Sequence, residues 1–518
     1  MINFVPKYMT EEGQQFNVGF QAGSYSTFAE NLAYGYKKGA FDIYAAQSWV
    51  SSDGHEPHSR AQQQSYYLNT GIQINDIWSL RLLVNYVEAQ TLSPFYDRAV
   101  GFRRGDMADR YDTKTSFATL TLNNQFERAS GYLKFYYNET YFWLRGESSG
   151  TATSRQINNL SGAKFRETLK LWPGGEIVAG FDLEQLKLKN ENTNHNNKLY
   201  RVWKFPDQQI FSPYLAVSQT LGQPESFHGT FSTGLRYYRH DLFKSKASPH
   251  VGLVVGYNNT DLFFNYARGI NYPSPVILQN FLLAPNTLPV NFMTEQIKPE
   301  IVDHYEVGLT HVIPEVARLG LTYFFDNGRD RTRAYMYGAL PTTAFFNSTV
   351  SRYKVQGLEL TGSWTIVNDL EVFGGATWLK AKATGDDGKS ATKLPFTPKF
   401  TFQAGLYWTF LANFNLSVDY QHVQGLYSGS LMRITGATAP SSNFTDLTAD
   451  YLMKNINVVN LRLGYKFNQE SMKLADAEVY LSVHNLLDQD YAYTLDGNRE
   501  PYYMPGITFM LGADFKFK

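Results

Sequence analysis

Cationic and aromatic side chains gather between Thr91 and Asp112, and together they could hold an anionic ligand. The members of this group are Tyr96, Arg98, Phe102, Arg103, Arg104 and Arg110. Guanidinium groups form charge-assisted hydrogen bonds with oxygen anions, and aromatic rings offer stacking surface beside them. We therefore expect a ligand-binding loop whose contacts come from Tyr96, Arg103, Arg104 and Arg110. In the alternative interpretation, the arginines pair with phosphate groups around the protein or with aspartates of the same stretch. Those aspartates are Asp97, Asp106, Asp109 and Asp112.

A second candidate for ligand contact is the long stretch from Gly269 to Lys298. It is mostly apolar and rich in amides, and its aromatic and amide side chains include Tyr272, Phe281, Asn286, Asn291 and Phe292. If this stretch folds inward over a cavity, Tyr272 can contact a ligand there. Packing against neighbouring loops is the competing interpretation.

Metal-ligating residue types are densest at Asp53, His55, Glu56 and His58. Carboxylates and imidazoles can bind a divalent ion. Two histidines in one loop are more often solvated, so we expect no metal site and keep His55 and His58 as candidates. The methionines lie far apart along the chain, which gives a thioether site for a soft metal no support.

Catalytic motifs are not supported. Residues 385–390 read Gly-Asp-Asp-Gly-Lys-Ser and imitate the end of a phosphate-binding loop, but position 383 is Ala where that motif requires Gly. Pro395 and Pro398 argue against the helix that should follow it. There is no His-Glu-x-x-His zinc helix. We expect neither an enzyme nor a bound cofactor.

The elements that carry these residues belong to one large fold. The chain has 518 residues and no Pro-, Gly- or Ser-rich linker that would divide it. Basic and acidic residues number 47 each, so the net charge creates no overall electrostatic attraction for nucleic acid. The absence of cysteine excludes a disulfide framework. Aromatic residues make up 16% of the chain, which suits a wall that is apolar outside and polar inside.

Short turns and long polar loops alternate from about residue 14 to the end of the chain. Gly, Pro, Asn and Asp mark the short turns, as at Asn75-Asp76, Asn258-Asn259 and Asn368-Asp369. Connections near Ser24 and Asp241 are short but keep the alternation. The segments between connections number about 22. This pattern predicts an all-β fold, a transmembrane antiparallel β-barrel with long extracellular loops and short periplasmic turns. A soluble sheet of this many strands would usually split into two packed layers.

Alternation with period two supports a wall between lipid and water. In the last strand Ile507, Phe509, Leu511, Ala513, Phe515 and Phe517 share one face, and polar or small residues share the other. Aromatic residues at strand ends fit girdles at the two membrane interfaces. Because backbone groups facing hydrocarbon must all be paired, the strand near Gln14 to Ala22 should pair with the strand near Gly506 to Phe517.

Five motifs in the C-terminal half, in this order, resemble those of TonB-dependent outer-membrane receptors. They are the strand and loop at residues 262–275, Lys298-Pro-Glu followed by Tyr305-Glu-Val-Gly308, Gly357-Leu-Glu359, the proline pair Pro395 and Pro398, and Asn485-Leu-Leu-Asp-Gln-Asp-Tyr491. Residues 1–13 resemble the last strand of the plug domain of that family and its link to the barrel. We therefore expect residues 14–518 to be the barrel and residues 1–13 a remnant of the connection from a plug that is absent from this chain.

The resemblance implies location, function and partners. It implies a multi-pass protein of the bacterial outer membrane, surrounded by lipid and lipopolysaccharide. The implied function is receptor-mediated uptake of a scarce ligand, above all a ferric siderophore or another metal chelate. The TonB complex would act only through the plug. A plug-less passive pore, or a structural barrel that partners another protein, is the alternative.

Overall fold

The computed structural model describes residues 6–95, 107–146, 154–193, 199–204, 206–273, 298–337, 344–384, 390–391, 394, 396–428, 451–467, 476–495 and 501–517. Every regular element within these ranges is a β-strand. No helix in the described ranges is long and apolar enough to cross a membrane.

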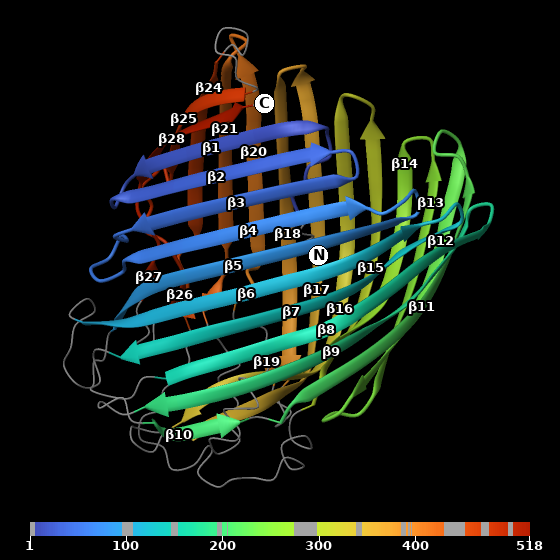
Figure 1. The fold of residues 1–518 in the computed structure, drawn as a ribbon, viewed down its shortest axis with the longest axis horizontal. Helices are drawn as coiled ribbons and strands as arrows, with labels where there is room; N and C mark the ends of the chain where they lie inside the picture. The colour runs from blue at the N-terminus through green and yellow to red at the C-terminus, as the bar shows by residue number, and fades with distance from the viewer. Residues whose placement is uncertain are drawn as a thin grey trace.

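A closed antiparallel sheet of 22 strands forms the wall of the molecule. In chain order the wall strands are β1 (Gly13–Gly23), β2 (Thr27–Lys38), β3 (Phe41–Ser52), β4 (Ala61–Gln73), β5 (Trp78–Phe95), β6 (Met107–Gln125), β7 (Ala129–Gly146), β8 (Ser154–Trp172), β9 (Gly175–Thr193), β11 (Gln208–Gly222), β12 (Phe227–His240), β13 (Lys246–Tyr257), β14 (Thr260–Asn271), β15 (Glu300–Ile313), β16 (Ala317–Tyr337), β17 (Ala344–Val367), β18 (Leu370–Thr384), β20 (Phe400–Phe410), β21 (Phe414–Gln424), β24 (Ile456–Lys466), β25 (Asp476–His484) and β28 (Thr508–Phe517). In Figure 1 the blue-to-green strands of the N-terminal half cross in front of the yellow-to-red strands of the C-terminal half, so the two halves face each other across a lumen.

The predicted closure between the first and last strands is confirmed. Strand β1 pairs with β28 from Phe16 opposite Phe517 to Gly23 opposite Met510. An open sheet would expose two rows of unpaired N–H and C=O groups to lipid. Because β1 pairs with β28, the groups of these two rows hydrogen-bond to each other.

Short and long connections separate to opposite ends of the wall, as predicted. Gly39 and Asn258 make two of the short turns with positive φ angles of 56° and 52°, a conformation that these two residue types adopt more readily than most. Strand β1 begins and β28 ends at this same end. The connections after β1 and β12 are short, as expected, although they lie at the long-loop end.

The remaining short strands lie at the long-loop end. Strands β10 (Leu199–Lys204) and β19 (Ser390–Ala391) extend the sheet beside β9 and β18. Two small sheets pair β22 (Tyr427–Ser428) with β23 (Tyr451–Leu452), and β26 (Ala492–Leu495) with β27 (Pro501–Tyr503). A buried apolar cluster packs next to them, formed by Val423, Leu426, Met453, Ile456, Val458 and Ala492.

The wall reaches further than the sequence predicted. Both ends of the expected loop from Thr91 to Asp112 are strand, at residues 91–95 and 107–112, because β5 and β6 stay paired from Thr91 opposite Tyr111 to Phe95 opposite Met107. Each additional cross-strand pair satisfies backbone groups that a loop would leave to water. Arg110 therefore lies on a wall strand and not on a loop.

Candidate functional site

Alternation along β5 assigns the two faces of the wall. Leu82 and Val84 are each 37% exposed and lie on the outer face, so Arg81 and Asn85 point into the lumen. Directly paired residues on neighbouring strands share a face. The register of each strand pair therefore carries this assignment around the barrel.

The segment before β1 lies against the inner wall near the short-turn end. Asn69 Nδ2 and Tyr67 Oη both donate hydrogen bonds of 2.9 Å to the carbonyl oxygen of Lys7. The Arg81 guanidinium lies 4.3 Å from the centre of the Tyr8 ring, a cation–π contact. The inner wall thus binds this segment through both its backbone and a side chain.

A buried ion pair supports that contact. Arg81 donates hydrogen bonds of 3.0 and 2.8 Å to the two carboxylate oxygens of Asp42, and one of 2.9 Å to Asn69 Oδ1. Asp42 is 8% exposed and Asn69 is 0% exposed. The charge of Arg81 is therefore compensated within the wall, and the guanidinium face stays available to Tyr8.

A cavity of about 840 Å³ lies between this segment and the inner wall. Its lining includes Pro6 and Lys7 from the segment, together with the inward side chains Asn17, Asn31, Tyr44, Asn85 and Asp514. These five wall side chains carry amide, hydroxyl or carboxylate groups. Leu83 and Phe117 also line the cavity, so the lumen is mixed in polarity on this side.

Cations, phenols and carboxylates meet further along the inner wall, in a group here called the inner-wall cluster. Its members are Lys134, Tyr136, Lys164, Asp182, Glu184, Tyr214 and Arg236, on β7, β8, β9, β11 and β12. Tyr136 Oη donates a 2.8 Å hydrogen bond to Glu184, and Lys164 Nζ lies 3.5 Å from Glu184 and 3.9 Å from Asp182. Arg236 donates to Asp182. Three cations thus face two carboxylates, which leaves an excess of positive charge toward the lumen.

Cross-strand glycines let inward aromatic rings lie flat on the wall. Tyr136 is paired with Gly162 and Tyr214 with Gly180, and a Cβ atom on either glycine would overlap the partner ring. The same arrangement recurs at five other direct pairs. They are Phe263 with Gly308, Phe324 with Gly357, Tyr353 with Gly328, Phe373 with Gly405 and Tyr480 with Gly512. These pairs smooth the lumen and position the phenols of the inner-wall cluster.

Arg110, which the sequence singled out for ligand contact, lies on the outer face. On β6 it has the same parity as Leu120, which is 42% exposed toward lipid. Its Nε donates a 2.8 Å hydrogen bond to Asp112 Oδ1, and Arg145 Nε lies 3.2 Å from Asp112 Oδ2. Of the two interpretations of the sequence, aspartate pairing is therefore the one that the structure shows for Arg110. Tyr96, Arg103 and Arg104 lie outside the described residues.

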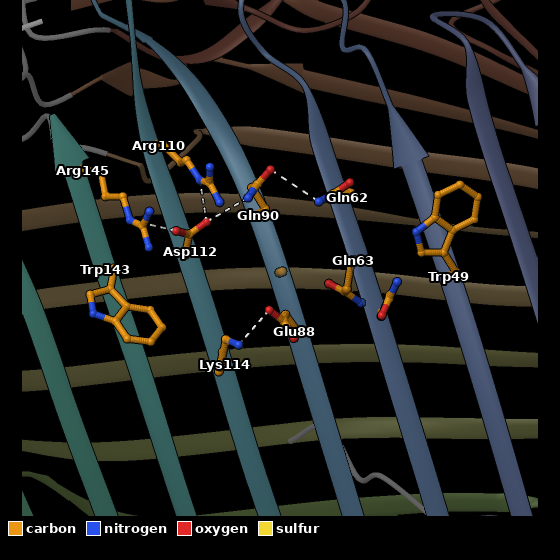
Figure 2. Close-up of a pocket in the computed structure, with 12 residues that line it drawn as sticks. Trp49, Gln62, Gln63, Glu88, Gln90, Arg110, Asp112, Lys114, Trp143 and Arg145 are labelled. Atoms are coloured by element: carbon orange, nitrogen blue, oxygen red, sulfur yellow. Dashed lines mark hydrogen bonds and ion pairs between the residues drawn. The ribbon is translucent and has the colours of Figure 1, made fainter. Parts of the chain in front are cut away.

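A cavity of about 360 Å³ surrounds this ion pair on the outside of the barrel. Figure 2 shows its lining side chains on five adjacent strands, β3 to β7, with the opposite wall behind them. Trp49 and Trp143 lie at its edges, and Lys114 forms a 2.9 Å ion pair with Glu88. On the same outer face, the aromatic pair Tyr66 and Tyr86 lies nearer the short-turn end than these charges. This order, apolar then aromatic then charged, is typical of the upper membrane interface.

Tyr272 lies at the long-loop rim, directly after β14. Its ring centre is 4.5 Å from that of His240 and 5.9 Å from that of Phe243. Burial raises the pKa of Tyr272 to about 12. In the structure, neither the Tyr272 hydroxyl nor His240 Nε2 has a hydrogen-bond partner among the described residues, although both atoms are buried. The rim therefore holds two buried polar groups whose hydrogen-bonding capacity is unsatisfied among the described residues.

The two candidate metal ligands have different surroundings. His55 Nε2 lies 2.9 Å from the carbonyl oxygen of Tyr503, a contact that joins the β3–β4 loop to β27. His58 is exposed and has a positive φ angle of 58°. Among the described residues, no group of three His, Asp or Glu side chains is arranged to hold a metal ion.

Sequence reasoning missed the inner-wall cluster. Its members are spread over more than 100 positions, between Lys134 and Arg236, and they share a face only because of strand register. Polar residues alternating with apolar ones on β7, β8 and β9 were the available signal. That signal predicts a lumen-facing surface but not which side chains meet.

Comparison with known proteins agrees with this architecture. The family model described as TonB dependent receptor-like, beta-barrel matches residues 7–486. The catecholate siderophore receptor Fiu of Escherichia coli K12 is 29% identical over 182 residues, which are 33% of this chain and 21% of that receptor. Its solved closed form has a TM-score of 0.73 at 15% identity, covering 98% of this chain and 82% of that one. The copper transporter OprC has a TM-score of 0.77 at 14% identity, covering 99% and 82%.

Proposed function

Because the chain belongs to the TonB dependent receptor-like β-barrel family, we propose that it is the barrel of an outer-membrane receptor that imports a ferric siderophore or a similar metal chelate. In this proposal residues 14–518 form the barrel, and residues 1–13 connect it to the plug on which the TonB complex acts. The contacts of Lys7 and Tyr8 with the inner wall support a connecting role for that segment.

The inner-wall cluster is the observation that carries the choice of cargo. Lys134, Lys164 and Arg236 face the lumen beside phenol groups, and both group types bind the oxygen-rich, anionic surface of a ferric chelate. A soft metal such as copper(I) prefers thioether and thiolate ligands. Similarity to OprC and to solved Fiu extends to the fold, so the cargo is inferred from these side chains and from the sequence match to Fiu.

A passive pore or a structural barrel is the competing function. A pore would need a free path through the lumen for small ions. The segment before β1 occupies part of the lumen beside β4 and β5. This occupancy favours the receptor.

The test is ligand binding by the purified barrel in detergent. Tryptophan fluorescence would follow titration with a ferric tris-catecholate chelate, haem and cobalamin. Replacing Lys164 or Arg236 by Gln removes a charge-assisted contact, and we expect the Kd for the ferric chelate to rise about tenfold or more. Lys187→Gln is the matched control, because Lys187 is an outward cation paired with Asp207 at 3.6 Å.

Two outcomes would reject the proposal. In the first, none of the three probes binds and single-channel recording of the barrel in a planar bilayer shows steady conductance, which would favour the pore. In the second, the ferric chelate binds but Lys164→Gln and Arg236→Gln bind it as tightly as the control does. That result would remove the argument for an anionic chelate.

A further inference from the structure

Two polar side chains, Glu30 on β2 and Gln47 on β3, lie on the lipid-facing surface of the wall. Glu30 pairs directly with Trp49, and Gln47 pairs directly with Leu32. The register from Leu82 across β4 and β3 places all four side chains on the outer face. They form a block of two residues by two, with the polar side chains on one diagonal and the apolar side chains on the other.

This block lies within the apolar band of the outer face. Phe28 and Leu32, which flank Glu30 on the outer side of β2, are each 36% exposed. Toward the long-loop end, the ring centres of Phe28 and Trp49 are 5.6 Å apart, as in the aromatic layer at a membrane interface. Glu30 is two residues nearer the short-turn end than Phe28, and Gln47 is two residues nearer that end than Trp49. Both polar groups are therefore beneath the aromatic layer and face hydrocarbon.

The wall gives these two polar groups little compensation. Gln47 Nε2 donates a 3.4 Å hydrogen bond to Glu30 Oε1, which is long for such a bond. In the described part of the chain, no Lys, Arg or His side chain lies within ion-pair distance of Glu30. Polar groups that face hydrocarbon without partners are costly. Hydrogen bonds supplied from outside the wall would therefore stabilise this surface.

A groove of about 460 Å³ opens on the same outer face, beside Gln47. Ala45 is the smallest outward side chain of its lining and lies between its larger direct neighbours Tyr34 and Leu68. The groove continues to Tyr66 on β4. An apolar side chain from outside the wall can enter at Ala45.

Glu30 and Gln47 lie at nearly the same height in the membrane. Barrel strands are tilted by about 35–45°, so rows of directly paired residues run obliquely. The row from Tyr36 on β2 to Leu82 on β5 rises toward the long-loop end, because Tyr36 is closer to its short turn than Leu82 is. From Glu30 to Gln47, the step across to β3 rises and the two-residue step along β3 descends. These two displacements largely cancel.

A twofold axis along the membrane normal, between Glu30 and Gln47, would make this surface complementary to itself. Glu30 of each copy would face Gln47 of the other copy, whose second amide hydrogen has no partner among the described residues. Phe20 is 42% exposed and pairs directly with Glu30, on the side away from Gln47. It would therefore face the groove at Ala45 of the other copy. Twofold symmetry repeats each of these contacts.

We propose that the outer face of β1 to β5 binds a second copy of this chain within the membrane, in a twofold dimer whose axis passes between Glu30 and Gln47. A lipid tail can fill the groove but offers no hydrogen bond to the two polar groups. A second copy fills the groove and pairs both groups. Tyr34 and Tyr66, beside the groove, are of a residue type that contributes strongly to protein interfaces. The surface is outside the barrel, so it does not depend on the cargo.

Cross-linking through an introduced thiol tests the dimer, because the sequence contains no cysteine. Leu32 lies close to the proposed axis, so Leu32→Cys should be joined to its own copy by a short bismaleimide in lipid vesicles. Leu253→Cys is the matched control, since Leu253 is on the outer face of β13 and is 42% exposed. At a low protein-to-lipid ratio, we expect at least about fivefold more covalent dimer from Leu32→Cys than from the control.

Further substitutions in the Leu32→Cys chain test the two kinds of contact. Glu30→Leu/Gln47→Leu removes the polar pair and should lower the dimer yield to that of the control, although the surface becomes more apolar. Glu30→Gln keeps a hydrogen-bonding group and should keep the yield. Phe20→Ala removes the side chain that enters the groove and should also lower the yield. Its matched control is Phe231→Ala, at an outward phenylalanine of β12 that is 49% exposed, and this variant should keep the yield.

Each outcome decides the proposal. Equal cross-linking of Leu32→Cys and Leu253→Cys would show random collision and would overturn it. Absence of covalent dimer from Leu32→Cys would assign the groove to lipid and would also overturn it. A yield that survives Glu30→Leu/Gln47→Leu would show that the polar pair does not hold the copies together, with the same consequence. Heat-dependent migration on a gel shows that each variant has folded. Chelate titration of the variants should be unchanged, so failure here is distinguishable from failure of the proposed function.

Discussion

Arg81 and Asp42 form a bidentate ion pair on the inner wall, with hydrogen bonds of 3.0 and 2.8 Å between guanidinium and carboxylate. The pair connects β5 with β3 across β4, whose Asn69 accepts a further hydrogen bond from Arg81. It also holds the guanidinium against the Tyr8 ring. One ion pair therefore joins the wall to the segment before β1.

Replacing Asp42 by Asn should destabilise the barrel and loosen that segment. The substitution leaves Arg81 without its counter-charge in a mostly buried position, and the Arg81 side chain is 27% exposed. We expect the free energy of unfolding to fall by about 1 to 3 kcal/mol. This loss is no larger than the loss from breaking a fully buried ion pair, because water reaches Arg81. Urea unfolding in lipid vesicles measures this change, and limited proteolysis near Lys7 measures the loosening.

A double variant controls that experiment. Asp42→Asn/Arg81→Gln removes both charges and should recover part of the lost stability. If the single variant unfolds at the wild-type urea concentration, the ion pair does not contribute as argued.

Gly162 should be intolerant of a side chain. A Cβ atom there would overlap the Tyr136 ring and the carbonyl oxygen of Leu183, so Gly162→Ala must displace Tyr136 from its hydrogen bond with Glu184. We expect about 1 to 3 kcal/mol of destabilisation, measured by urea unfolding, and a weaker interaction with the ferric chelate. Gly269→Ala is the comparison, because a Cβ there meets its nearest heavy atom at 3.9 Å. Equal effects of the two substitutions would contradict the account of the inner face.

Arg110→Ala should leave chelate affinity unchanged, because Arg110 points away from the lumen. Its ion pair with Asp112 is partly exposed, at 36% for the Arg110 side chain, so we expect a loss of stability below about 1 kcal/mol. Fluorescence titration and urea unfolding measure the two effects. A tenfold rise in Kd for the chelate would show that Arg110 does reach the ligand.

Tyr272→Phe should separate ligand binding from stability. The hydroxyl is buried without a hydrogen-bond partner among the described residues, so its removal should cost no stability and can increase it slightly. If Tyr272 contacts the chelate, as the sequence predicted, the Kd should rise severalfold while the unfolding midpoint stays constant. An unchanged Kd would leave Tyr272 as a packing residue of the rim.

Alkaline titration tests the environment of the same phenol. Burial raises the pKa of Tyr272 to about 12, above the usual value of 10.0. A raised pKa in the folded state means that the neutral form contributes stability below pH 10, and that this contribution is lost as the pH rises toward 12. The absorbance difference at 295 nm between the wild type and Tyr272→Phe should therefore develop near pH 12. Its appearance near pH 10 would show that the ring is solvated.

Much of the architecture could be predicted from the sequence because it depends on local patterns. The tight-turn residues and period-two alternation predicted the number of strands, the segregation of short and long connections, and the pairing of β1 with β28. The apolar face of the last strand was also correct, with Phe509, Leu511 and Phe517 exposed at 48%, 60% and 39%.

Strand length and the orientation of Arg110 could not be predicted in the same way. The stretch from Thr91 to Asp112 is polar, and polar residues are common both in loops and in strands that extend beyond the membrane. The assignment of its two ends, residues 91–95 and 107–112, to β5 and β6 depends on cross-strand hydrogen bonds between these strands. Once the pairing is known, parity with Leu120 places Arg110 outside.

The sequence by itself determined that this chain closes into a barrel with an apolar outer face, because alternation and turn residues act within a few positions of each other. Only the tertiary structure decided which side chains meet. The ion pair of Arg81 with Asp42, the fit of Tyr136 over Gly162, and the ion pair of Lys114 with Glu88 all depend on strand register. A shift of one residue moves every side chain to the other face, and the register is set by the closure of the whole sheet and not by any one segment.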